Sequence, residues 1–162
     1  MSESVSNKPI GGSPRGLEEV RSGSTLLALI VRRDFTPAGI QFLTTDDYPQ
    51  QIAGMVHPKG HRIPAHVHNT VHREIETTME TIVVRSGRLR VDFYLDDRSY
   101  LESRILEGGD VVLLAAGGHG FECLEATDML EIKQGPYAGS VDKVRFEGVE
   151  REAVLVKGSI DG

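Results

Sequence analysis

The sequence predicts an all-β protein, and three observations lead to this fold class. From Thr25 to Gly135 the chain is a series of short apolar runs separated by turns rich in Gly, Asp and Pro. One of these runs, Arg88–Leu95, alternates apolar with polar residues, which is the period of a strand with one buried face. No segment shows the sustained apolar period of a helix. Many short strands at regular spacing predict an antiparallel sandwich or barrel.

The expected strands follow one another along the chain. Thr25–Arg32 comes first and is dense in Leu, Ile and Val, which favour strands. Asp96–Ser99 is a turn between Arg88–Leu95 and Tyr100–Leu106, and Val71–Met79 is polar enough to be a loop. The remaining expected strands are Gly39–Thr44, Gln51–His57, a strand that carries His66 and His68, Thr81–Arg85, Val111–Leu114, Gly120–Leu124 and Met129–Gln134.

Length and composition predict one compact domain with two extensions. A chain of 162 residues is long enough for one self-sufficient core. Residues 1–22 are rich in Ser, Gly and Pro and poor in large apolar side chains, so we expect a flexible arm there. We place the β-domain at residues 23–147 and a C-terminal extension at residues 148–162.

The charge pattern argues against nucleic-acid and membrane partners. The formal net charge is −6, and no run of Lys and Arg offers a surface for phosphates. Leu26–Val31, the longest apolar run, is too short to span a bilayer, and the N-terminus lacks the apolar core of a signal peptide. The single cysteine, Cys123, allows no internal disulfide and is expected to be buried. We expect a cytoplasmic protein.

Histidines point to a metal site. His66 and His68 are one residue apart, so on a strand they share a face. Imidazole is the commonest protein ligand of divalent metals. His119 follows on a glycine-rich turn, and Glu80 lies at the start of an apolar strand. Since one strand cannot surround an ion, a closed sheet would have to turn these four side chains toward a common axis.

Two motifs in this region resemble those of the cupin family. The first contains Gly60, His66, His68, Glu80 and Gly87, with a spacer between His68 and Glu80 that is longer than in the family's motif. The second contains Gly109, Asp110, Gly117 and His119, with Ala115 at the position of the motif's proline. Together the motifs cover Gly60 to about Leu124.

The resemblance implies a double-stranded β-helix, the jelly-roll barrel of cupins. It implies one divalent transition metal (Fe, Mn, Ni, Zn or Co) held by His66, His68, Glu80 and His119. It further implies a small-molecule substrate and a metal-dependent isomerase, epimerase or dioxygenase of sugar or organic-acid metabolism. A homodimer that pairs through an edge strand is also implied, and Leu26–Val31 is the candidate for that strand.

Alternatives remain open from the residues alone. His66 and His68 could be ordinary polar residues of an exposed strand, and His119 could simply cap its turn. His72, Glu74 or Glu76, which lie in the long spacer, could take the place of Glu80. Alternation puts Glu131 and Lys133 on one face of their strand, which either lines a cavity or faces solvent. The protein could also be a non-catalytic, metal-dependent binder or sensor of a sugar-like ligand, or a metal-free barrel used for association.

Overall fold

The structure is a computed structural model, and it describes residues 15–158. Ten strands make up three antiparallel sheets, with two short 3-10 helices, η1 (Gly139–Val141) and η2 (Arg151–Ala153). The strands are β1 Leu17–Ser22, β2 Thr25–Val31, β3 Ile40–Phe42, β4 Ala53–Met55, β5 Glu80–Ser86, β6 Arg88–Tyr94, β7 Tyr100–Glu107, β8 Val111–Leu114, β9 Gly118–Cys123 and β10 Asp128–Lys133. Residues 15–158 contain no α-helix, and hence none that could cross a membrane. The predicted all-β class is confirmed.

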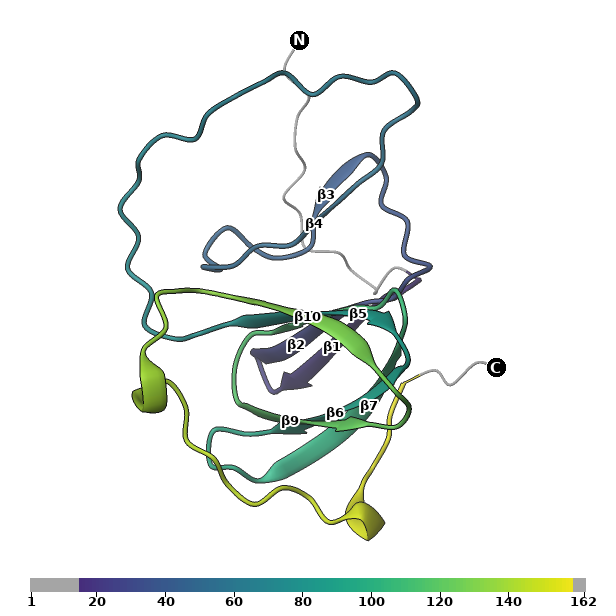
Figure 1. The fold of residues 1–162 in the computed structure, drawn as a ribbon, viewed down its shortest axis with the longest axis vertical. Helices are drawn as coiled ribbons and strands as arrows, with labels where there is room; N and C mark the ends of the chain where they lie inside the picture. The colour runs from purple at the N-terminus through teal and green to yellow at the C-terminus, as the bar shows by residue number, and fades with distance from the viewer. Residues whose placement is uncertain (1–14, 159–162) are drawn as a thin grey trace.

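Two of the sheets face one another. A five-stranded sheet has the order β1-β2-β8-β5-β10, and a three-stranded sheet has the order β7-β6-β9. They form the two layers in the lower half of Figure 1, with β10, β5, β2 and β1 above β9, β6 and β7. Within residues 15–158 the strands lie in these separate sheets and no barrel closure is detected.

The core fills the space between the two layers. It is made of alternate residues from strands of both sheets, and its members are Val20, Leu27, Ala28, Ile30, Ile82, Val84, Leu89, Val91, Phe93, Leu106, Val112 and Leu114. In β8, Val112 and Leu114 point into this core, while Leu113 points to the other side. This alternation is the period-two pattern of a strand.

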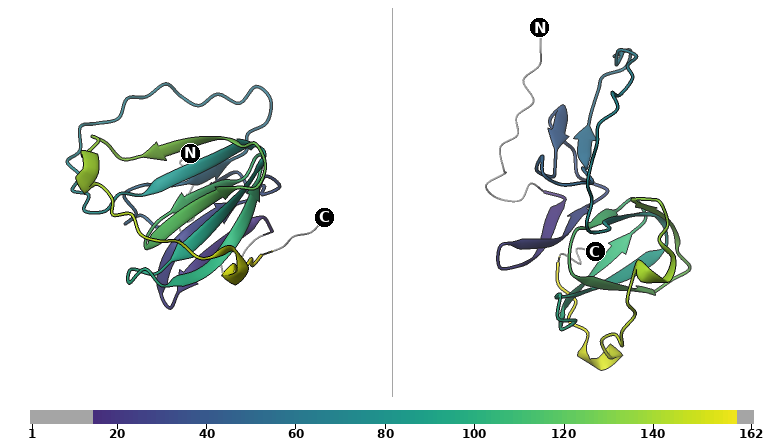
Figure 2. Two further views of the ribbon diagram at one scale, coloured as in Figure 1. Left: turned by 60° about the horizontal axis from the view of Figure 1, so that its bottom comes forward. Right: turned by 90° about the vertical axis from the view of Figure 1, so that its left-hand side faces the viewer.

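The outer face of the five-stranded sheet is buried as well. Leu29 and Leu113 belong to a second apolar cluster, against which Phe35, Leu43 and Ile52 pack. These three residues come from residues 32–55, the segment that carries the β3–β4 hairpin and stands over this sheet in Figures 1 and 2. The five-stranded sheet is therefore covered on both sides around β2 and β8, whereas β10 at its edge is exposed.

This burial explains the continuous apolar run in β2. A strand that is buried on both faces needs apolar side chains in both directions. β2 lies between β1 and β8, so Leu26–Val31 is not an edge strand, and its assignment as the strand that pairs across a dimer was wrong. The edges of this sheet are β1 and β10.

Two other expectations also need correction. Leu17–Ser22, expected within a flexible arm, forms β1, with Leu17 and Val20 buried. The rest of that arm up to residue 14 is outside the described residues. His66 and His68 were expected on a strand, but residues 56–79 contain no strand. This segment, called here the β4–β5 loop, makes the wide arc in Figure 1 and stands away from the two layers in Figure 2.

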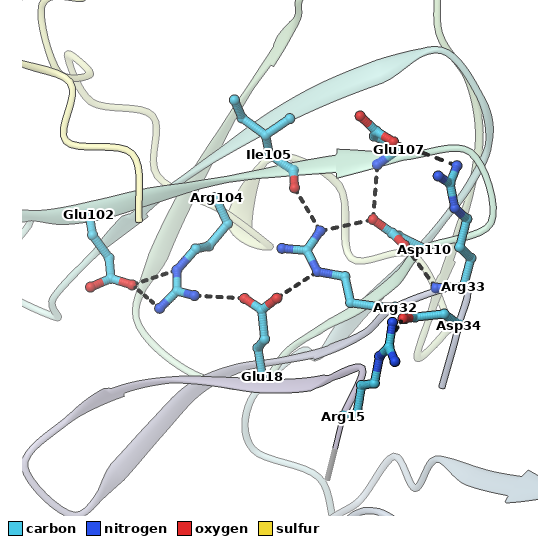
Figure 3. A network of polar contacts seen from close by, with 10 residues as sticks. All are labelled: Arg15, Glu18, Arg32, Arg33, Asp34, Glu102, Arg104, Ile105, Glu107 and Asp110. Carbon is cyan, nitrogen blue, oxygen red and sulfur yellow. Dashed lines mark hydrogen bonds and ion pairs between the residues drawn. The ribbon is translucent and has the colours of Figure 1, made fainter. Parts of the chain in front are cut away.

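An ion-pair network joins the two sheets at one side of the molecule. Glu18 of β1 accepts hydrogen bonds from Arg32 (2.7 Å) and from Arg104 of β7 (2.7 Å). Arg32 also donates to the carbonyl oxygen of Ile105 at 2.7 Å and to Asp110 at 2.9 Å (Figure 3). The carboxylates and guanidinium groups are largely buried and hold multiple partners, as buried charges require.

Candidate functional site

A cavity of about 620 Å³ lies where one end of the sheets meets the C-terminal part of the chain. Its walls come from the start of β5, from β9, from β10 and from residues 142–148. A cavity of this size accommodates a small organic molecule. The lining residues are Thr78, Glu80, Tyr94, Gly117, Gly118, His119, Gly120, Phe121, Glu131, Asp142, Lys143, Val144, Arg145, Phe146 and Gly148.

The strand register brings Glu80 and His119 into this cavity. Glu80 pairs with Leu114 on β8, and His119 pairs with Phe93 on β6. Directly paired residues of antiparallel strands point to the same face. Leu114 and Phe93 both point into the core, so Glu80 and His119 also point inward, from opposite sheets. Their side chains meet, with His119 Nε2 2.9 Å from Glu80 Oε2.

Positively charged side chains surround the second oxygen of Glu80. Its Oε1 lies 3.8 Å from Lys133 Nζ and 3.9 Å from Lys143 Nζ. Lys133 is the direct cross-strand partner of Glu80 in the β5–β10 pair. Since the Glu80 side chain is only 8% exposed, these partners compensate a carboxylate that water cannot solvate.

Lys133 is the centre of a cluster of carboxylates. Its ammonium group lies 3.4 Å from Asp142 and 3.6 Å from Glu131, in addition to its contact with Glu80. Asp142 also accepts a hydrogen bond from Thr78 at 3.2 Å. Burial lowers the pKa of Lys133, but the hydrogen bond to Asp142 and the negative charges around it raise the pKa by more. The pKa of Lys133 is thus above its ordinary value, and the side chain stays charged near neutral pH.

Glu80 and His119 have a geometry that suits two neighbouring metal ligands. Metal–nitrogen and metal–oxygen bonds of about 2.1 Å put adjacent octahedral ligand atoms about 3 Å apart. The observed separation of 2.9 Å fits that value. The same distance is that of a hydrogen bond, so the structure places Glu80 and His119 side by side without testing their role as ligands.

The structure does not bring the other two predicted ligands to this pair. His66 and His68 are exposed in the β4–β5 loop, where their ring centroids lie 5.2 Å apart and His66 Nδ1 contacts the carbonyl oxygen of Pro64 at 2.9 Å. Across residues 15–158, no three His, Cys, Asp or Glu side chains converge as a metal site requires. The open alternatives to Glu80, which are His72, Glu74 and Glu76, are exposed in the same loop.

Other residues of the two motifs stabilise turns and loops of the fold. Asp110 is buried and accepts hydrogen bonds from Arg32, from the Arg33 backbone N–H and from the Glu107 backbone N–H. Gly87 makes the turn between β5 and β6 with a φ of +85°, and a Cβ there would collide with the carbonyl oxygen of Ala126. Glycine is therefore required for both conformation and space at this turn.

Several residues of the cavity were not identified from the sequence. Asp142, Lys143 and Arg145 lie in a segment without a repeating pattern, so only the path of the chain reveals their position. The alternation in β10 was a usable signal: Glu131 belongs to the cavity wall and is also 45% exposed, while Lys133 on the same face points to Glu80. Cys123, expected to be buried, is exposed.

Comparison with known proteins returns no match. No family model matches the chain, and no curated protein or solved structure is significantly similar to it.

Proposed function

We propose that this cavity binds a small molecule together with one divalent transition metal, and that the protein is a metal-dependent isomerase, epimerase or dioxygenase of sugar or organic-acid metabolism. The observation that carries the proposal is the contact between Glu80 and His119 in the cavity wall, because both had been selected from the sequence as metal ligands. A cupin-like jelly roll belongs to the same proposal, and the two facing antiparallel sheets support it.

The proposal requires the β4–β5 loop to fold over the cavity, so that His66 and His68 complete the ligand set. The loop is suited to such movement because the side chains of residues 58–78 are exposed and few hydrogen bonds hold them. Glu80 is twelve positions after His68, with eleven residues between them. An extended chain of that length spans about 40 Å, so the tether from β5 permits the required approach.

The metal, when bound, would polarise an oxygen of the substrate as a Lewis acid. The chain's own residues prepare the site for this. Lys133, fixed by Asp142 and Glu131, pairs with Glu80 and holds its side chain in place. Glu80 in turn orients the imidazole of His119. Phe121 and Phe146 contribute apolar walls that limit access of water to one side of the cavity.

A metal titration tests the proposal. Metal-stripped protein is titrated with Mn²⁺, and with Fe²⁺ without oxygen, by calorimetry and elemental analysis. One equivalent should bind, and Glu80→Gln, His119→Ala and the double variant His66→Ala/His68→Ala should each weaken binding at least about tenfold. The matched control is His57→Ala/His61→Ala, which removes two histidines of the same loop and should leave the affinity unchanged. Full metal occupancy in the 66/68 double variant would reject the proposed ligand set.

A second candidate is a non-catalytic small-ligand binder. It is favoured by one observation: Lys133 pairs with one oxygen of the buried Glu80 carboxylate, and His119 contacts the other oxygen. Metal-loaded and metal-free protein are incubated with a panel of sugars, sugar phosphates and organic acids, aerobically and anaerobically. Product formation supports the enzyme, whereas thermal stabilisation without any product supports the binder.

A further inference from the structure

One wall of the cavity is a segment of the C-terminal part of the chain that is held firmly against the three-stranded sheet. Phe146 packs edge-on against Tyr94, with ring centroids 5.0 Å apart. The backbone N–H of Val149 donates to the Tyr94 hydroxyl at 2.9 Å, and Arg151 pairs with Glu122 of β9 at 2.7 Å. These contacts fix the position of residues 143–148 next to β9.

The carboxylates of the cavity already share one cationic partner, Lys133. Glu80 contacts His119 and Lys133, and both Asp142 and Glu131 contact Lys133. The single positive charge of Lys133 therefore compensates part of their negative charge within the protein. An anion that enters the cavity would meet less repulsion than the number of acidic residues alone suggests.

The cations on the C-terminal wall are much less occupied. Within residues 15–158 the Lys143 ammonium group has only the 3.9 Å contact with Glu80, and its side chain is 54% exposed. Arg145 lines the cavity and, among the described residues 15–158, its guanidinium group has no recorded hydrogen bond or ion pair. A guanidinium group offers five N–H donors in a planar arrangement that suits a carboxylate or a phosphate.

We propose that the ligand of this cavity carries an oxyanionic group, a carboxylate or a phosphate, which Arg145 and Lys143 bind. The rest of the ligand lies against Phe121 and Phe146, and the Phe146 ring can take its position because Gly118 has no Cβ, which would come within 3.0 Å of the ring. The anionic group is thereby held on the C-terminal wall, and the remainder of the ligand points toward Glu80 and His119. This inference rests on the proposed function for the location of the ligand, but it does not require the metal.

Calorimetry on metal-stripped protein tests the inference with two probes, citrate and inorganic phosphate, at low and high salt. The wild-type protein should bind at least one probe, and binding should weaken as salt rises. Arg145→Ala and Lys143→Ala should each weaken it about tenfold, and Arg145→Lys should give an intermediate value because it keeps the charge but loses the planar fork. Circular dichroism checks that each variant is folded. Arg145→Gln, which removes the charge but keeps a polar side chain, replaces Arg145→Ala if that variant does not fold.

The matched control is Arg73→Ala, which removes the same charge from the exposed β4–β5 loop. It should change the affinity less than twofold. A loss equal to that of Arg145→Ala would show that binding follows overall charge and would overturn the inference. Absence of anion binding together with stabilisation by a neutral sugar would overturn it as well, while the proposed function stands. Anion binding without any metal binding would support the inference and reject the metal-dependent function.

Discussion

Glu80 Oε2 lies 2.9 Å from His119 Nε2, although 39 residues separate the two positions in the sequence and they belong to different sheets. The contact exists because the cross-strand neighbours of both residues point into one core. It joins the first predicted motif to the second, and it is the reason that the cavity, and no other part of the surface, is proposed as the functional site.

A double-mutant cycle measures this contact in solution. Glu80→Gln, His119→Ala and the combined variant are compared with the wild type by urea unfolding at pH 7. We expect a coupling energy of about 1 kcal/mol, because a hydrogen bond to a charged and buried group contributes more than a neutral exposed one. A coupling energy near zero would mean that the two side chains do not pair in solution.

The network around Glu18 predicts unequal effects for two adjacent glutamates. Glu18→Ala removes the shared acceptor of Arg32 and Arg104, which are largely buried, and should lower the free energy of unfolding by about 2–3 kcal/mol. Glu19→Ala removes an exposed pair with Arg21 and should cost about 0.5 kcal/mol or less. Chemical denaturation compares the two, and equal losses would contradict a structural role for the network.

The lowered pKa of Glu102 predicts that the folded protein loses stability in acid. Burial raises the pKa of Glu102, but hydrogen bonds from Lys157 and Arg104 lower it by more, so that it lies below the ordinary 4.5. A lowered pKa in the folded state stabilises the protein above the unfolded-state pKa, and this contribution disappears as the pH falls through the folded-state value.

The stability difference between the wild type and Glu102→Gln should therefore be constant above about pH 5 and should shrink as the pH falls below about 4. Thermal unfolding at a series of pH values measures it. Lys157→Ala should weaken the effect, since it removes one of the two donors to Glu102. A difference that does not change with pH would show that Glu102 is not ionised preferentially in the folded state.

The β4–β5 loop predicts the first sites of proteolysis. Trypsin should cut after Lys59, Arg62 or Arg73, which are exposed in a segment without strands. The two fragments should remain together in gel filtration, because β2 of the first pairs with β8 of the second. Gel electrophoresis and mass spectrometry identify the sites. If His66 and His68 close over a metal, loading with Mn²⁺ should slow this cleavage, and first cuts within residues 80–133 would contradict the described fold.

The local pattern of side chains determined most of the strands. Arg88–Leu95 and Val111–Leu114 were located from alternation and turns, and they appear as β6 and β8 with nearly the same bounds. The structure gives a local reason for the motif glycine Gly87, since only glycine tolerates its backbone conformation beside Ala126. Each of these two strands depends on residues close together in the sequence, so the local sequence is enough to predict it.

Sheet order and long-range contacts were decided only by the tertiary structure. The apolar composition of Leu26–Val31 indicates a buried strand. It does not indicate that β1 pairs with its edge or that residues 32–55 cover its outer face. The same holds for the site: Glu80 and His119 were predicted, whereas Lys143 and Arg145 became visible only when the C-terminal segment was seen beside β9. His66 and His68 lie in the β4–β5 loop because no neighbouring strand pairs with that segment, and pairing depends on residues remote in sequence.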